Sequence, residues 1–241
     1  MTLIGDLTQY GIIKTKPRMS EQMVGEYRKY LSAKPVYRAH TKAYSDGVGT
    51  TVDDALEKSE VACYDMASVI TAPHVWEMGV LYLRAAEAYF NEPAKIYSLN
   101  AFWVGPGKAD IQGIQNWHRD QDDRKFLALF IYGSDVLEEA DGPHLFKKGT
   151  HVRNGNGDSA VEDGEVETIY GPAGTMFLAD TFGFHRGIKP ARGKRLLSWV
   201  RYCVSEPPAI HAFDHPEPAP LAAMAGRVPA ELEERVRMVV R

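Results

Sequence analysis

Two histidines and one aspartate have the residue types and spacing of a metal site. His118 and Asp120 are separated by one residue, and His185 follows much later in the chain. In an extended segment, alternate side chains point to the same face, so His118 and Asp120 can reach one ion while Arg119 points away. Two imidazoles and one carboxylate are the ligands of non-haem Fe(II) sites that leave coordination positions open. We therefore predict that these three residues bind Fe(II).

An arginine downstream of His185 would suit a dicarboxylic co-substrate. A planar guanidinium can bind a carboxylate through two parallel hydrogen bonds. Arg195 begins an apolar segment, whereas Arg192 stands beside Gly193 in a predicted turn. Spacing alone leaves Arg192 open as the alternative, and we favour Arg195 for this role.

The length and charge of the chain disfavour several classes of protein. Its 241 residues fit one large domain, and its net charge of -4 disfavours a nucleic-acid binder, which needs clustered positive charge. The longest apolar run, Phe126–Tyr132, is too short to span a membrane, and Met1–Tyr10 lacks the pattern of a secretory signal. Two cysteines, Cys63 and Cys203, form no disulfide framework. We therefore expect a cytoplasmic protein without a membrane partner.

Two helices are predicted in the N-terminal part of the chain. Ser20 is a suitable N-cap, and an apolar stripe follows it until Pro35 ends the element. A second stripe predicts a longer helix from Pro73 to Asn91, with proline at its start. Between the two helices, Thr41–Asp53 carries glycines among polar residues and is predicted to be a loop.

From Lys95 onward, short apolar segments alternate with turn residues. Several short strands at this spacing predict a sandwich or barrel and disfavour alternating strand–helix units. The fold is therefore predicted to be mainly β with flanking helices. The predicted strands are Ile96–Val104, Phe126–Tyr132, Leu145–Phe146, Val166–Tyr170, Thr175–Leu178 and Leu196–Val204.

We predict a single domain over residues 1–241. Helices within residues 20–91 are expected to buttress a β core over residues 95–204, and residues 205–241 form a C-terminal extension. The extension holds a proline-rich run, Pro207–Pro220, and ends in a helix predicted over Pro229–Val240. Within the core, Asn154–Gly164 is predicted to be a surface loop because of its glycines and acids.

Four short segments in the second half carry a resemblance to a known family. They are Gln115–Asp120, Asp141–Pro143, Lys148–His151 and Phe184–Gly187, and Arg195 follows them. In this order they resemble the phytanoyl-CoA dioxygenase (PhyH) family of Fe(II)/2-oxoglutarate oxygenases. The third segment looks like the Pro-Gly-Ser-His turn of that family, with lysine for proline and threonine for serine. The resemblance covers roughly residues 97–202.

The resemblance implies a double-stranded β-helix, or jelly roll, in which His118, Asp120 and His185 hold Fe(II). It also implies that Arg195 binds the side-chain carboxylate of 2-oxoglutarate. Asn100 is the candidate for a polar residue on the preceding strand that touches the keto acid. The implied activity is hydroxylation of a small organic molecule with dioxygen and 2-oxoglutarate, releasing succinate and carbon dioxide. Neither the substrate nor the oligomeric state is indicated.

Other polar residues near the ligands are interpreted differently. His144 and His151 flank a glycine turn and are interpreted as turn residues or as supports for the ligands, since one further histidine completes the set. The neighbouring acids Asp120, Asp122 and Asp123 lack the glycine and distal glutamate of a calcium-binding loop.

Two rival functions remain open from the sequence alone. A cupin-type metal dioxygenase would cleave its substrate without a keto acid and would not need Arg195. A catalytically decayed binding protein on the same fold would not need an intact ligand set, so the three ligands disfavour it. The activity of an Arg195 variant and the affinity for iron distinguish these alternatives.

Overall fold

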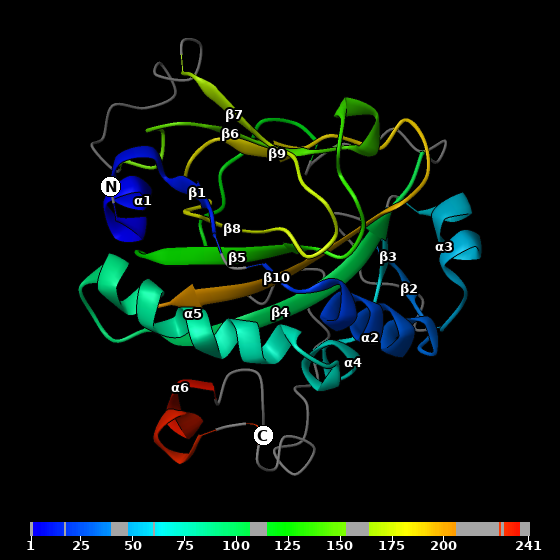
Figure 1. Ribbon diagram of the computed structural model, residues 1–241, viewed down its shortest axis with the longest axis horizontal. Helices are drawn as coiled ribbons and strands as arrows, with labels where there is room; N and C mark the ends of the chain where they lie inside the picture. The colour runs from blue at the N-terminus through cyan, green and yellow to red at the C-terminus, as the bar shows by residue number, and fades with distance from the viewer. Residues whose placement is uncertain are drawn as a thin grey trace.

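A computed structural model describes residues 2–16, 18–39, 48–59, 61–106, 115–152, 164–205, 227 and 229–236. Its centre is a pair of antiparallel sheets that lie face to face (Figure 1). The large sheet has the order β1-β8-β5-β10-β4-β3-β2, and the small sheet has the order β7-β6-β9. Most neighbouring strands are distant in sequence, as expected of a jelly roll. The predicted fold class, mainly β with flanking helices, is confirmed.

The strands of the large sheet are β1 (Ile12–Lys14), β8 (Met176–Ala179), β5 (Phe126–Tyr132), β10 (Arg195–Cys203), β4 (Lys95–Val104), β3 (Val61–Cys63) and β2 (Tyr37–Ala39). Those of the small sheet are β7 (Val166–Ile169), β6 (His144–Lys147) and β9 (His185–Gly187).

Strand β10 lies between β4 and β5 in the middle of the large sheet, and it is buried on both faces because helices cover one face and the small sheet covers the other. Side chains of a strand alternate between its faces. Val200 and Tyr202 join the cluster packed under the helices, whereas Leu197 and Trp199 join the cluster between the two sheets. This double burial explains why apolar residues occur on both faces of β10.

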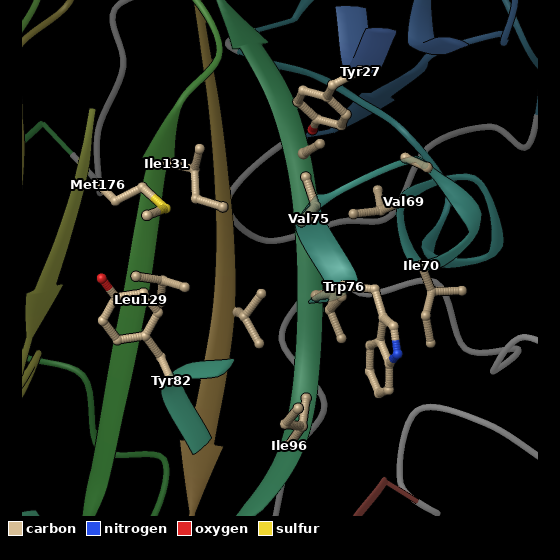
Figure 2. Packing of buried hydrophobic residues seen from close by; sticks show 14 of the residues in the cluster. Tyr27, Val69, Ile70, Val75, Trp76, Tyr82, Ile96, Leu129, Ile131 and Met176 are labelled. Atoms are coloured by element: carbon tan, nitrogen blue, oxygen red, sulfur yellow. The ribbon is translucent and has the colours of Figure 1, made fainter. Parts of the chain in front are cut away.

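Helices cover the outer face of the large sheet. Figure 1 shows α2 (Glu21–Ser32), α4 (Met66–Thr71) and α5 (Val75–Phe90) along this face, opposite the small sheet. Val69, Val75 and Trp76 pack there against side chains such as Ile96 and Ile131 (Figure 2). The remaining helical elements are α1 (Leu3–Tyr10), α3 (Val52–Lys58), the 3-10 helices at Glu139–Asp141 and Ala230–Leu232, and α6 (Glu233–Val236).

Local capping sets where these helices begin. The side chains of Thr2, Ser20, Thr51 and Asp65 each accept a hydrogen bond from a backbone N–H in the first turn. The predicted N-cap Ser20 is therefore confirmed. The longest helix, α5, ends at Phe90, one residue before the predicted end, and its C-cap Asn91 has a left-handed conformation with φ 53°.

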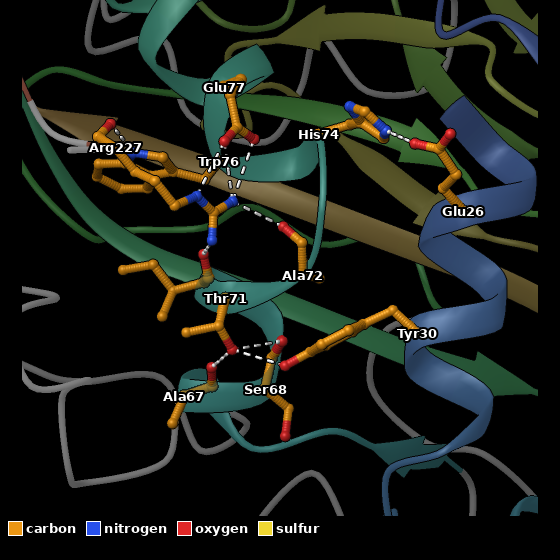
Figure 3. A network of polar contacts seen from close by, with 11 residues as sticks. Glu26, Tyr30, Ala67, Ser68, Thr71, Ala72, His74, Trp76, Glu77 and Arg227 are labelled. Atoms are coloured by element: carbon orange, nitrogen blue, oxygen red, sulfur yellow. Dashed lines mark hydrogen bonds and ion pairs between the residues drawn. The ribbon is translucent and has the colours of Figure 1, made fainter. Parts of the chain in front are cut away.

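The C-terminal extension is tied to the helical layer through Arg227. Its guanidinium binds Glu77 and donates to the carbonyl oxygens of Ile70 and Ala72, at 3.1 and 2.9 Å (Figure 3). In return, Trp76 Nε1 donates to the Arg227 carbonyl at 2.9 Å. This anchor lies on the face of the large sheet that is turned away from the small sheet.

Several sequence-based predictions lie partly or wholly outside the described residues. The proline-rich run is among them, as are most of the two predicted loops and the end of the C-terminal helix. The single-domain organisation over residues 1–241 therefore stays a prediction. Among the described residues, no helix is long and apolar enough to cross a membrane.

Candidate metal centre

The three predicted ligands converge at one end of the space between the sheets. A pair of backbone hydrogen bonds joins His118 to His185, with N···O distances of 3.1 and 3.0 Å. The ring centroids of the two histidines lie 4.2 Å apart. With Asp120, they offer three ligand atoms within 4.8 Å of one another. Residues 65 positions apart in sequence thus lie together in one candidate site.

Hydrogen bonds to backbone carbonyls orient both imidazoles. His118 Nδ1 lies 2.8 Å from the Asn116 carbonyl oxygen, and His185 Nδ1 lies 2.9 Å from that of Gly183. Because a carbonyl oxygen only accepts, each Nδ1 carries the proton and each Nε2 keeps its lone pair. The Nε2 atoms lie 3.9 and 3.8 Å from the carboxylate oxygens of Asp120.

Burial keeps His185 in the form that can bind a metal. It lowers the pKa of this imidazole to about 4, against the attraction of Asp120. A neutral imidazole is the form that ligates transition metals. Two imidazoles and one carboxylate fit a divalent ion such as Fe(II), and three ligands on one side leave coordination positions open.

A second arginine of β10, not predicted as part of the site, holds the ligand carboxylate. Arg201 reaches Asp120 Oδ2 at 3.3 Å and Asp122 Oδ2 at 2.8 Å. Tyr97 donates a hydrogen bond to the same oxygen of Asp122. The only signal in the sequence was a charged residue within an otherwise apolar, buried strand.

The acids beside Asp120 point to other partners. Asp122 is bound by Arg201 and Tyr97, and Asp123 Oδ2 accepts hydrogen bonds from the backbone N–H groups of Val204 and Ser205. The three aspartates therefore do not surround a common point, in agreement with the rejection of a calcium loop.

Arg119 points away from the ligands, as the alternation of an extended segment predicted. Its NH1 group donates to the carbonyl oxygens of Thr150 and Phe182, both at 2.6 Å. The guanidinium also lies 3.9 Å from the ring centroid of Phe184. Arg119 thereby joins the ligand segment to the turn after β6 and to the loop that leads into His185.

The two candidate arginines occupy opposite environments. Arg192 is 65% exposed and pairs with Glu138 and Asp141 at the surface. Arg195 is 2% exposed, and its NH1 donates to the carbonyl oxygens of Gly142 and Ile188. Among the described residues, no carboxylate pairs with Arg195, and its Nε has no hydrogen-bond partner. Burial lowers the pKa of this guanidinium, which makes an anionic partner favourable.

Asn100 lies on β4 directly opposite Trp199 of β10. It is buried, and strand alternation places it on the face that carries Phe102 and Trp199 between the sheets. This position is compatible with the predicted contact to a keto acid, which stays a prediction.

An aromatic wall adjoins the ligands. Phe130 stacks on Phe177 with centroids 4.9 Å apart, and Trp199 meets Phe130 edge-on at 6.3 Å. His144 stacks on the ligand His185 at 5.5 Å. His144 and His151 were interpreted as turn residues or as supports for the predicted ligands. The structure places His144 in β6 against the ring of His185, as a support would lie, and His151 in the turn.

Comparisons with known proteins match the fold and not the sequence. No family model and no curated protein matches this chain. The epimerase SnoN, solved with Fe3+, alpha ketoglutarate and nogalamycin RO, superposes with a TM-score of 0.63 at 14% identity, covering 89% of both chains. HygX from Streptomyces hygroscopicus, solved with nickel, 2-oxoglutarate and hygromycin B, gives 0.55 at 15% identity over 95% of this chain and 93% of HygX.

A third neighbour is AviO1 from Streptomyces viridochromogenes Tue57. It has a TM-score of 0.59 at 16% identity, covering 86% of this chain and 96% of AviO1. At these identities the similarity establishes a shared fold. The chain therefore has the fold of non-haem, 2-oxoglutarate-dependent enzymes, and the predicted jelly roll is confirmed.

Proposed function

We propose that this chain is an Fe(II)- and 2-oxoglutarate-dependent oxygenase that hydroxylates a small organic molecule. The observation that carries the proposal is the arrangement of two groups. His118, Asp120 and His185 offer a three-ligand face within 4.8 Å, and Arg195 is buried nearby without a carboxylate partner among the described residues. The first group suits a ferrous ion, and the second suits a dicarboxylic acid.

The balance of the proposed reaction is simple. A ferrous ion bound with 2-oxoglutarate supplies dioxygen activation, in which one oxygen atom enters succinate and the other enters the product. The keto acid loses carbon dioxide, and a carbon–hydrogen bond of the substrate becomes a carbon–hydroxyl bond. No further reductant is required.

Each residue of the site has a proposed task. His118 and His185 present Nε2 lone pairs, and Asp120 presents a carboxylate that Arg201 holds in place. Arg195 is proposed to bind the distal carboxylate of the keto acid, and Asn100 to touch its polar atoms. The aromatic wall excludes water from the reacting groups.

The PhyH resemblance gives a narrower form of this proposal. The order of the site segments supports a PhyH-like enzyme, and the bound compounds of SnoN and HygX support a small-molecule substrate. Because SnoN is an epimerase, the same fold also serves outcomes other than hydroxylation.

The proposal is tested by spectroscopy before any substrate is known. Anaerobic addition of 2-oxoglutarate to Fe(II)-loaded protein should produce a weak visible charge-transfer band. The Asp120→Ala variant should show no band under the same conditions. If the wild-type protein binds Fe(II) but shows no band, a metal dioxygenase that uses no keto acid is favoured. If the protein does not bind iron, a catalytically decayed binding protein is favoured.

A further inference from the structure

His144 is a buried polar residue with no role in the site described so far. Only 4% of it is exposed. Its imidazole lies against the ring of His185 at 5.5 Å, and it also contacts Phe130 at 4.9 Å and Phe177 at 5.1 Å between ring centroids. Among the described residues, no group forms a hydrogen bond with its buried Nε2 atom.

The backbone around His144 is firmly held. Its N–H donates to Tyr132 Oη at 2.9 Å, and this hydroxyl in turn donates to the Ile169 carbonyl at 3.0 Å. Both neighbours in the small sheet, β7 and β9, pair with His144 in regular register. The imidazole therefore belongs to a strand that is paired on both edges. A loop movement would not bring its Nε2 atom to a hydrogen-bond partner.

His144 stands between the ligand group and Arg195. On one side its ring stacks on the ligand His185. On the other side it pairs in register with Gly187, where an added Cβ atom would lie 3.1 Å from Arg195 NH2. Arg195 also donates to the carbonyl of Gly142, two residues before His144.

The position of His144 determines which side chain a bound keto acid would contact between the metal and Arg195. A keto acid that binds the metal through one end and Arg195 through the other must pass beside the imidazole of His144. At that place the imidazole can offer an N–H donor from its buried Nε2 atom. A buried polar atom without a partner destabilises the fold, and a ligand that supplies the partner removes this cost.

We propose that His144 donates a hydrogen bond from Nε2 to the keto acid and shares its recognition with Arg195. This inference rests on the proposed function, since it requires that a dicarboxylic keto acid occupies the space between His185 and Arg195. The ligand-free protein then carries an unsatisfied imidazole that becomes satisfied on binding.

Two substitutions separate hydrogen bonding from packing. His144→Leu removes the polar atoms and keeps an apolar volume against Phe130 and Phe177. His144→Gln places an amide N–H close to the position of Nε2. His151→Leu is the matched control, because His151 is also buried but bonds to the Thr8 carbonyl at 3.1 Å, on α1.

The measurements are calorimetric titration of 2-oxoglutarate into Ni(II)-loaded protein and the melting temperature of the metal-free protein. We expect His144→Leu to weaken 2-oxoglutarate binding at least about tenfold, or ~1.4 kcal/mol, without lowering the metal-free melting temperature. We expect His144→Gln to keep an affinity within about threefold of wild type, a difference of ~0.7 kcal/mol. His151→Leu should lower the melting temperature and leave the affinity unchanged.

Each remaining outcome has a definite meaning. Equal affinity in wild type and His144→Leu overturns the inference while the proposed function stands. Equally weak binding in both His144 variants also overturns it, because packing against His185 would then be the role of the ring. If wild-type protein binds Ni(II) but not 2-oxoglutarate, the proposed function itself fails.

Discussion

Asp120 is positioned by one contact of its backbone and one contact of its carboxylate. Its backbone N–H donates to the Thr181 carbonyl at 2.8 Å, and its Oδ2 atom lies 3.3 Å from Arg201. The carboxylate lines the site and does not fill the apolar core. A substitution of Asp120 should therefore abolish activity and leave the fold intact.

We expect Asp120→Ala to abolish succinate release and to weaken Fe(II) binding, because one of three ligands is lost. His118→Ala should behave in the same way. Turnover is measured as succinate formed per enzyme, and folding is followed by circular dichroism. Unchanged turnover in either variant would remove the assignment of the metal ligands.

The two candidate arginines make a matched pair of substitutions. Arg195→Ala should raise the KM for 2-oxoglutarate by about 10- to 150-fold, because a charge-assisted pair worth about 1.5–3 kcal/mol is lost. Arg192→Ala should leave this KM unchanged, since its guanidinium already binds Glu138 and Asp141 at the surface. The reverse result would transfer the role to Arg192.

At the scale of elements, β10 combines an apolar core strand with two inward arginines. Arg195 lies near its start and Arg201 near its end, on the same face as Leu197 and Trp199. Arg201 compensates the buried carboxylate of Asp122 and the partly buried carboxylate of Asp120. The contacts of Arg201 therefore couple the free energy of unfolding to the negative charge at the candidate metal site.

We expect Arg201→Met to destabilise the metal-free protein by about 3–5 kcal/mol, because it leaves buried and partly buried carboxylates unpaired. Bound Ni(II) neutralises Asp120, so the loss should be smaller in the metal-loaded protein. Chemical denaturation with and without Ni(II) measures both values. Arg124→Met is the control, since its pair with Glu92 lies at the surface and is screened by solvent. An equal loss with and without Ni(II) would contradict this coupling.

The strands that the sequence predicted best are those with long apolar runs. The prediction for β5 agrees with the structure at both ends, and that for β10 differs by one residue at each end. Their burial on both faces produces a continuous signal that turn residues interrupt. Strands β1, β2 and β3 were missed because three residues are too few to show a period.

The site was only partly predictable, because local sequence patterns do not show which strands pair. The His-x-Asp spacing lets His118 and Asp120 share one face in any extended segment. Their meeting with His185 depends instead on a pairing between segments distant in sequence. The roles of Arg201 and His144 depend on which strands become neighbours. Register places Arg201 beside Ser98 and Ala128, and His144 beside Gly187, and no local pattern encodes these pairings.

At the scale of the whole molecule, the two faces of the large sheet have separate tasks. The face toward the small sheet carries both buried arginines and the aromatic residues Phe130, Phe177 and Trp199. The three predicted ligands lie on the small sheet and in the segment that pairs with it. The outer face carries the helices and the anchor of the C-terminal extension (Figures 1 and 3). Changes on the outer face should therefore alter stability more than co-substrate binding.

Arg227→Ala tests this separation. The substitution removes an ion pair with Glu77 and hydrogen bonds to the carbonyls of Ile70 and Ala72. We expect a loss on the order of 1–2 kcal/mol, or about 2–6 °C in melting temperature, with an unchanged KM for 2-oxoglutarate. Arg84→Ala on α5, the helix that carries Glu77, is the control, because the side chain of Arg84 is 75% exposed and its pair with Glu87 should contribute little to stability. A raised KM in Arg227→Ala would show that the extension acts on the metal site through the sheet.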